Sequence, residues 1–258
     1  MKRIISVVLC LAMAFCLFST IAESEKDAVI AKGKLIVGIT DFEPMDYRDE
    51  NGSWIGFDAD MALAFGAYLG VEIEFVEIDW DNKVLELKSG NIDCVWNGMT
   101  LLDEVLSSMS CSNPYANNAQ VVIVPADKAD AYQIIESLKG LSFAVEAGSS
   151  GEAAAVNLGF DYNPVQNQAA TLLEVAAQTS DAAIIDSLMA AAMVGEGTDY
   201  SSLTYTVPLT EEKYGVGFRK GSDLVDELNA FFASSWADGT MMRIAEKYGV
   251  QLAIIPQE

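Results

Sequence analysis

The fold is decided by residues 71–100, which read VEIEFVEIDWDNKVLELKSGNIDCVWNGMT. Hydrophobic and acidic residues alternate over 71–78, and this alternation predicts a strand with one buried face. A short helix is expected over 82–88, because a Ser-Gly pair follows it and provides a stop signal. The apolar run 92–96 then predicts a second strand. A strand, a helix and a strand in this order favour parallel pairing, so this stretch indicates an α/β domain.

The alternation of strands and helices continues on both sides of this stretch. Further strands are expected at 34–40, 121–124, 141–145, 181–185 and 214–218, and further helices at 58–69, 132–139, 151–158, 171–178, 187–194, 223–236 and 241–248. These elements form two α/β sets and a C-terminal tail that has too few strands to fold alone. The simplest packing returns the tail to the first set.

That packing divides the chain into two lobes. Lobe 1 is expected to contain residues 31–115 plus 217–258, and lobe 2 residues 121–211. The chain then crosses between the lobes twice, at 116–120 and 212–216. Two crossing strands can serve as a hinge, and a cleft between two lobes is a usual place for a ligand.

The first 22 residues have the composition of an export signal. Lys2 and Arg3 are followed by an apolar run over 4–18, and the small residues Thr20 and Ala22 are spaced like a cleavage site. The apolar run is shorter than the ~20 residues that span a bilayer. We therefore expect a cleaved signal peptide over 1–22 and a protein located outside the cytoplasm, in the periplasm or on the outer cell surface.

Composition excludes several classes of function. The formal charge is −23, which indicates solubility and repulsion of nucleic acid and anionic lipid. The chain has no histidine, so Ser-His-Asp and Cys-His catalysis and histidine metal sites are excluded. Two cysteines remain after the signal, Cys94 and Cys111; buried free thiols are the preferred interpretation, and a disulfide stays open. We expect no metal, no cofactor and no enzymatic activity.

Several short motifs occur in a fixed order along the chain. They are GKLIVG at 33–38, GFDAD at 56–60, LKSGNID at 87–93, GMT at 98–100, SNPY at 112–115, AVEAGS at 144–149, DAAIID at 181–186 and GVGFRKGS at 215–222. In this order the chain resembles the extracellular solute-binding proteins of ABC importers, specifically the polar amino-acid-binding family 3. The resemblance covers roughly 31–250. It implies two Rossmann-like α/β lobes joined by a two-strand hinge, the type II periplasmic binding protein fold.

The resemblance also implies a ligand site for an amino acid. It assigns Phe42 and Trp80 as aromatic walls, Gly98 and Thr100 as backbone and hydroxyl contacts, Gly148, Ser149 and Ser150 as the carboxylate seat at a helix N-terminus, and Asp186 as the acid that meets the ligand ammonium. Plainer interpretations stay open, because the aromatic residues can be core, Ser149 can be a simple N-cap, and Asp186 can cap the next helix. We expect a monomer that delivers its ligand to an ABC permease.

One position departs from the family pattern. After the GMT motif the family has an arginine that binds the ligand carboxylate, and Val105 occupies this position. A carboxylate left without its charged partner costs roughly 2–5 kcal/mol. Glu146 adds another acid near the proposed site. The cleft then suits an amine that lacks an α-carboxylate, or it holds an amino acid through backbone N–H groups alone.

Two other functions of the same fold remain as alternatives. The first is a sensor or scaffold in which transport has been lost, which the missing arginine favours. The second is a dehydratase that uses Glu146 with Asp186 as an acid/base pair, although paired acids in a cleft more often bind a cation.

Overall fold

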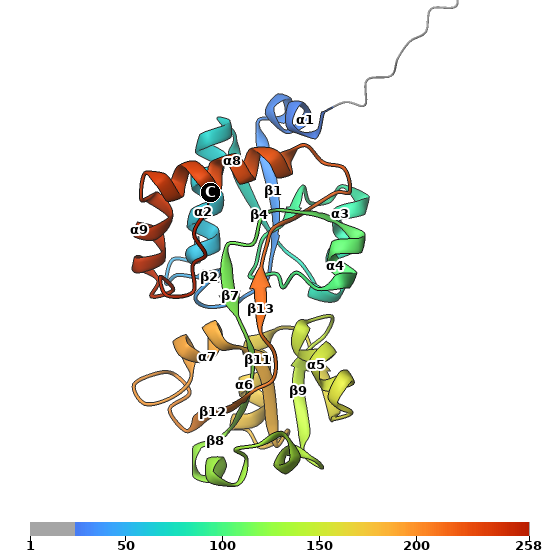
Figure 1. The fold of residues 1–258 in the computed structure, drawn as a ribbon, viewed down its shortest axis with the longest axis vertical. Coiled ribbons are helices and arrows are strands. Elements are labelled where there is room, and N and C mark those ends of the chain that lie inside the picture. Colours follow the sequence, from blue (N-terminus) through green and yellow to red (C-terminus); the bar gives the residue numbers. More distant parts are fainter. Residues whose placement is uncertain (1–23, 258) are drawn as a thin grey trace, which may run out of the picture.

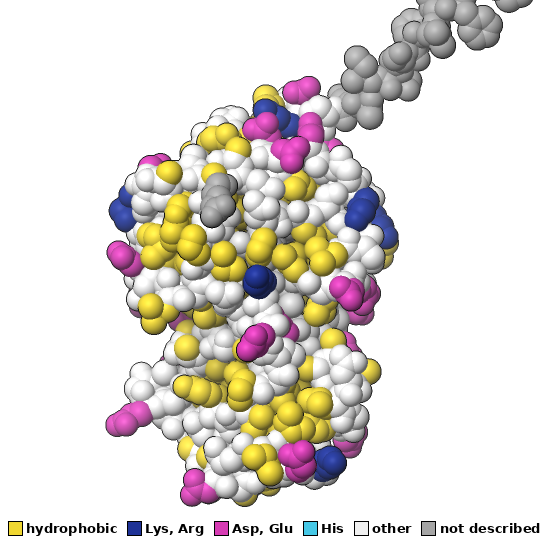
Figure 2. Space-filling model, in the orientation of Figure 1, with side chains coloured by type: hydrophobic (Ala, Val, Ile, Leu, Met, Phe, Trp, Pro, Cys, Tyr) yellow, Lys and Arg dark blue, Asp and Glu magenta, His cyan; other side chains and the backbone are white. Residues whose placement is uncertain are grey.

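The computed structural model of the protein describes residues 24–257, so the expected signal peptide over 1–22 lies outside the described part. These residues form two lobes, one above the other in Figure 1, and each lobe contains its own five-stranded sheet. On the face drawn in Figure 2, the surface narrows between the lobes. The expected fold class of two α/β lobes is confirmed.

The first lobe is built on a mixed sheet with the strand order β4-β1-β5-β14-β6. Its strands are β1 (Lys34–Ile39), β4 (Glu72–Glu77), β5 (Cys94–Val95), β6 (Ser110–Cys111) and β14 (Gly217–Phe218). Its helices are α1 (Glu25–Lys32), α2 (Phe57–Leu69), α3 (Lys83–Ser89), α4 (Asp103–Ser108), α8 (Leu224–Ala237) and α9 (Thr240–Lys247), with a short hairpin of β2 (Tyr47–Arg48) and β3 (Trp54–Ile55). Strand β1 pairs in parallel with β4 and β5, as the strand-helix-strand pattern predicts.

The C-terminal tail packs on the first lobe. The rings of Phe65 in α2 and Phe231 in α8 lie 5.4 Å apart, and those of Trp96 and Phe232 lie 5.7 Å apart. At the surface, the ammonium of Lys247 donates to Asp60 of α2 at 2.7 Å. Buried aromatic contacts of this kind contribute area and specific geometry. These aromatic contacts hold α8 on the first lobe, and the Lys247–Asp60 ion pair joins α9 to α2, so the tail returns to this lobe as the sequence indicates.

The second lobe has the strand order β10-β9-β11-β8-β12. Its strands are β8 (Gln120–Pro125), β9 (Ser142–Glu146), β10 (Asp161–Val165), β11 (Ala182–Asp186) and β12 (Leu203–Pro208), and its helices are α5 (Ser150–Leu158), α6 (Gln168–Ala176) and α7 (Ser187–Met193). Strands β9, β10 and β11 are parallel, and β8 runs antiparallel to β11 and β12. Because β9 and β11 are parallel neighbours, their carboxyl ends meet at one edge of the sheet.

A third, two-stranded sheet lies between the lobes. Strand β7 (Ala116–Asn118) pairs antiparallel with β13 (Glu212–Tyr214), and in Figure 1 both pass through the waist of the molecule from one lobe to the other. These strands fall within the two segments that the sequence predicts as a hinge. The lobe boundaries and the hinge motion stay predictions.

Two elements expected from the sequence are wrong. The strand expected over 214–218 is two strands, because the chain leaves β13 at Tyr214 and joins the first sheet only at Gly217. The helix expected over 132–139 is replaced by one short 3₁₀ helix, at Ile135–Leu138, and a second 3₁₀ helix, at Ala126–Ala131, precedes that range. The hydroxyl of Ser137 donates to the carbonyl of Ile134 at 2.7 Å, and such local side-chain bonds compete with helix formation.

Strands β10 and β12 are not among the strands expected from the sequence, and they form the two edges of their sheet. Pro164 lies inside β10, and proline is tolerated in a sheet at an edge.

Between residues 24 and 257, none of the helices combines the length and the apolar character needed to cross a membrane. Cys94 and Cys111 are free thiols, the first buried and the second half-buried.

Candidate functional site

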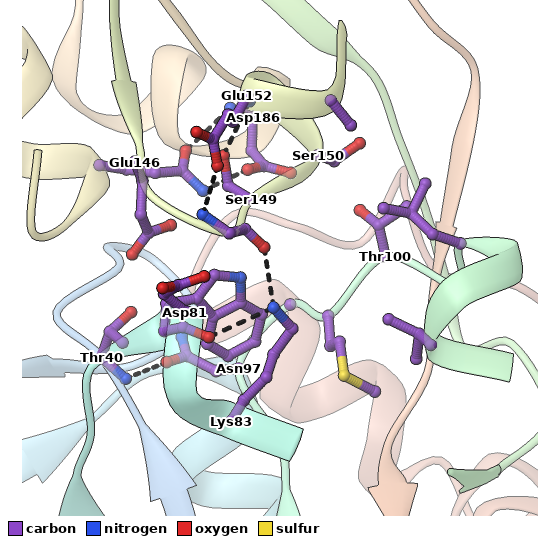
Figure 3. Close-up of a pocket in the computed structure, with 18 of the residues that line it drawn as sticks. Thr40, Asp81, Lys83, Asn97, Thr100, Glu146, Ser149, Ser150, Glu152 and Asp186 are labelled. Carbon is purple, nitrogen blue, oxygen red and sulfur yellow. Dashed lines mark hydrogen bonds between the residues drawn. The ribbon is translucent and has the colours of Figure 1, made fainter. Parts of the chain in front are cut away.

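A cavity of about 410 Å³ lies between the lobes, large enough for an amino acid. Its walls come from both lobes, as Figure 3 shows. All ten positions that the sequence singles out line it: Phe42, Trp80, Gly98, Thr100, Val105, Glu146, Gly148, Ser149, Ser150 and Asp186. The structure therefore brings together residues that are up to 144 positions apart in the chain.

Phe42 and Trp80 form apolar parts of the wall in the first lobe. Their exposed fractions are 3% and 7%, so each ring is mostly covered by protein and turns one small surface toward the cavity. The Phe42 ring meets Tyr214 of β13 edge-on, with 6.3 Å between centroids. Lys83 lies over the Trp80 ring, with its ammonium 4.8 Å from the centroid.

Gly98 forms the wall next to Phe42, and a buried acid positions it. Its backbone N–H donates to Oδ2 of Asp58 at 2.6 Å, and the hydroxyl of Tyr115 donates to the same oxygen at 2.7 Å. Gly98 has φ of +54°, and a Cβ there would lie 2.4 Å from Cε1 of Phe42. Glycine is thus required for both its conformation and its contact. Burial raises the pKa of Asp58 to about 7, although these donors oppose the shift.

The loop at Gly148 and Ser149 leads into helix α5. Ser149 is the N-cap, because its hydroxyl accepts from the backbone N–H of Glu152 at 3.1 Å. The carboxylate of Glu152 in turn accepts the backbone N–H of Gly148 at 2.7 Å. The N–H groups of Gly148 and Glu152 are therefore occupied by this chain's own oxygens, whereas those of Ser150 and Gly151 have no acceptor among the described residues.

Asp186 ends β11 and lies 4% exposed at the cavity wall. Four side chains donate to it: Asn118, Gln120, Gln168 and Tyr214, the last at 2.6 Å. Burial raises the pKa of Asp186 to about 7, with Glu212 as the second cause. Asp186 occupies the N-cap position of α7, but its side chain makes no capping hydrogen bond. The helix-cap interpretation is therefore wrong for the side chain.

Glu146 ends strand β9 beside Asp186, and its carboxyl group points into the cavity (Figure 3). The residue is 3% exposed, and among the described residues its Oε1 has no hydrogen-bond partner. Burial raises the pKa of Glu146 to about 8, and the charge of Asp186 acts in the same direction. A buried carboxyl oxygen without a donor is costly, so this atom is suited to a donor supplied by a ligand.

Glu212 in β13 joins the two lobes at the edge of the site. It accepts from Thr100 of the first lobe at 2.8 Å, and from Ser150 at the start of α5 in the second. Asn118 and Gln120 also donate to it, at 3.2 and 3.1 Å. The hydroxyls of Thr100 and Ser150 are therefore engaged with Glu212, and either would have to turn away from it to donate to a ligand.

Val105 and Lys83 define the wall where the family's arginine is expected. Val105 is 4% exposed and packs in an apolar cluster with Trp80 and Met99. Lys83 is 8% exposed and reaches across to the second lobe, where its ammonium donates to the carbonyl of Gly148 at 2.8 Å. It also donates to the carbonyl of Trp80 at 3.2 Å. Burial lowers the pKa of Lys83, and Glu146 is the strongest influence that opposes this.

Three residues at or next to the site, Lys83, Asp58 and Glu212, are not among those predicted from the sequence. Lys83 had a usable signal, because it stands four residues before Leu87, which is buried, and so shares the inner face of the helix. Asp58 lies in a recognised motif, but its hydrogen bond to Gly98 joins residues 40 apart. Glu212 had no usable signal, since apart from the nearby Thr210 its partners come from three distant segments, at Thr100, at Asn118 and Gln120, and at Ser150.

The chain belongs to the bacterial extracellular solute-binding proteins of family 3, whose family model matches residues 35–251. A curated relative is the arginine-binding extracellular protein ArtP of Bacillus subtilis (strain 168). It is 26% identical over 254 residues, which are 96% of this chain and 98% of ArtP. The curated relatives also include cystine-binding and histidine-binding proteins.

A similar solved structure is the ancestral amino acid-binding protein AncCDT-1, a precursor of cyclohexadienyl dehydratase. Its TM-score is 0.80 and its sequence identity 32%, and the match covers 87% of this chain and 99% of that one. Cyclohexadienyl dehydratase of Pseudomonas aeruginosa is 26% identical over 154 residues, which are 58% of each protein. The fold is thus that of the type II periplasmic amino-acid-binding proteins.

Proposed function

We propose that this protein is the extracytoplasmic substrate-binding subunit of an ABC importer, and that it captures an amino acid or a related small polar amine between its lobes. The observation that carries the proposal is the cavity itself. It brings the ten expected positions together and places a buried ammonium, Lys83, and a buried carboxyl, Glu146, in one enclosed space. Such a site is complementary to a small ligand that carries charge.

The proposed cycle uses β7 and β13 as the hinge. Both strands connect the lobes, and Asn118 and Tyr214 from these strands donate to Asp186 at the cavity wall. A ligand that contacts Asp186 would act on the same hydrogen bonds that hold the connecting strands. Ligand binding would therefore favour the closed arrangement, because closure adds contacts from the second lobe. We propose that the closed form is monomeric and delivers the ligand to a membrane permease.

Binding is favoured over catalysis by the surroundings of the two acids. A dehydratase would need Glu146 and Asp186 to exchange protons with a substrate. Three of the four side chains that donate to Asp186 meet its Oδ1, and Gln168 meets its Oδ2. An acid held by so many donors has little freedom to act as a base. The same arrangement leaves Oδ2 a free acceptor position that suits a ligand ammonium.

Thermal denaturation of residues 23–258 in the presence of single compounds tests the proposal. A panel of the twenty amino acids and their decarboxylated amines should contain at least one compound that raises the melting temperature, because a ligand that binds the folded state stabilises it. The rise should grow with the logarithm of ligand concentration. If no compound in the panel changes the melting temperature at 10 mM, roughly ten times a weak millimolar Kd, the proposed ligand class is wrong.

A further inference from the structure

Lys83 occupies a position in which a buried positive charge is left without a carboxylate partner. Within residues 24–257, ion pairs up to 4.0 Å join Lys26, Lys32, Lys34, Arg48, Arg219 and Lys247 to acids. Lys83 makes no such pair in this part of the chain, although it is 8% exposed. An ammonium that is removed from water and not paired with an anion is destabilising.

The ammonium of Lys83 also has hydrogen-bonding capacity to spare. It carries three N–H donors, and two of them meet the carbonyl oxygens of Trp80 and Gly148. Figure 3 shows Lys83 rising from α3 into the cavity, where it meets the loop of the second lobe. Among the described residues that line this cavity, Lys83 is the one cation, and it shares the space with several acids. One donor and a full charge are therefore available to an anionic group in the cavity.

The helix N-terminus beside Lys83 is partly occupied by this chain's own oxygens, and within the described part of the chain the N–H groups of Ser150 and Gly151 stay open to a carboxylate together with Lys83. At the start of α5, the N–H groups of Gly148 and Glu152 donate to the carboxylate of Glu152 and the hydroxyl of Ser149. Val105, at the position of the family's arginine, belongs to the same apolar cluster as Trp80, and Val84, the residue next to Lys83, packs against this cluster. Lys83 thus enters the cavity from the wall in which the arginine is missing.

We infer that Lys83 binds the carboxylate of the ligand and replaces the arginine absent at position 105, so the ligand is a zwitterionic α-amino acid. The inference deepens the proposed function and rests on it. Glu146 lies in the same cavity with an oxygen that lacks a donor, so it receives the ammonium of the ligand. Charge-assisted hydrogen bonds at both ends orient the ligand, whereas an amine without a carboxylate leaves Lys83 unpaired. The cavity therefore discriminates against such amines.

Isothermal titration of matched pairs of compounds tests this inference. The probes are L-arginine with agmatine and L-histidine with histamine, together with the corresponding pair for any amino acid that stabilises the protein best. Wild type should bind the amino acid of a pair at least tenfold more tightly than its amine. This comparison needs no variant, so it remains decisive even if a substitution impairs folding. Equal or tighter binding of the amine overturns the inference and leaves the proposed function standing.

Two variants separate the charge of Lys83 from its contact with Gly148. Lys83→Gln keeps an N–H donor for the Gly148 carbonyl and removes the charge, whereas Lys83→Met removes both. Both variants should lose at least tenfold in affinity for the amino acid, with less than a threefold change for the amine. Lys88→Met, on the exposed side of the same helix, is the control and should bind as wild type does. Wild-type affinity in Lys83→Gln would show that the residue only joins the lobes, and binding of no compound by wild type would overturn the proposed function as well.

Discussion

The ammonium nitrogen of Lys83 lies 2.8 Å from the carbonyl oxygen of Gly148, so a side chain of the first lobe donates a hydrogen bond to the backbone of the second. The lobes also meet at Asp81, because a Cβ built on Gly148 would lie 2.7 Å from its Cα. A contact this close leaves no room for a side chain at position 148. Opening of the cleft must separate these atoms, and closure must bring them back together.

Gly148→Ala should weaken ligand binding by tenfold or more, because the added methyl group collides with the Asp81 backbone when the lobes close. Gly148 has φ of +70°, so the substitution also adds a backbone cost of about 1 kcal/mol. Titration calorimetry measures the loss in affinity, and small-angle X-ray scattering shows whether the ligand still makes the protein more compact.

Gly159→Ala is the matched control for that experiment. Gly159 has φ of +68° at the end of α5, and no atom lies within 4 Å of a Cβ built there. This variant should therefore lose a similar amount of stability but keep the wild-type affinity. If both variants bind the ligand equally well, the contact between Gly148 and Asp81 does not limit closure.

The ligand-free protein should be more stable at pH 5 than at pH 8. Burial raises the pKa values of Asp58 and Asp186 to about 7 and that of Glu146 to about 8. Between pH 4 and 8 the folded state therefore holds protons that the unfolded chain releases. The free energy of unfolding falls as pH rises through this interval, by about 1.4 kcal/mol per unit for each group, and levels off above the folded-state pKa values. Urea denaturation at several pH values measures it, and maximal stability at pH 8 would contradict the prediction.

The fold could be predicted from the sequence because its signals are local. The run at 71–100 contains its own strand, turn and helix signals, and its glycine stop lies where α3 ends. The prediction of secondary structure fails where the conformation of a segment depends on the strand or sheet that it packs against. Strand β10 contains a proline that only an edge position tolerates, and the break after Tyr214 depends on which sheet each half joins.

Ten of the residues that line the cavity could be predicted from the sequence, but their hydrogen bonds and the presence of Lys83 could not. Motif order placed Asp186 and Ser149 at the cavity, yet no local pattern indicates that four donors from distant segments meet Asp186. The sequence shows that Val105 stands in place of the arginine. It does not show that Lys83, 22 positions earlier, lines the same cavity. Tertiary structure alone joins these two positions.

Glu146→Gln should weaken the binding of ligands that carry an ammonium group and make their affinity less dependent on pH. Glu146 must lose its proton to form the ion pair, and its pKa of about 8 means that this costs free energy at neutral pH. Wild-type affinity should therefore rise between pH 6 and 8, by up to about tenfold per unit for each proton released. The slope should be shallower in Glu146→Gln, with Asp186 providing what remains.

Titrations at pH 6, 7 and 8 measure this dependence. Glu136→Gln is the control, because Glu136 is exposed on a 3₁₀ turn of the second lobe. It should keep the wild-type slope. A slope that is unchanged in Glu146→Gln would remove Glu146 from the ammonium site.

Val105→Arg should restore amino-acid binding to a protein that lacks Lys83. In Lys83→Met the cavity has lost its cation, and an arginine at 105 returns a positive charge to the same wall with two parallel donors for a carboxylate. The double variant should recover at least tenfold in affinity for the amino acid over Lys83→Met, with no comparable gain for the matching amine. Val105→Leu in the Lys83→Met background controls for the added volume. A double variant that binds no better than Lys83→Met would show that the carboxylate does not lie between these two positions.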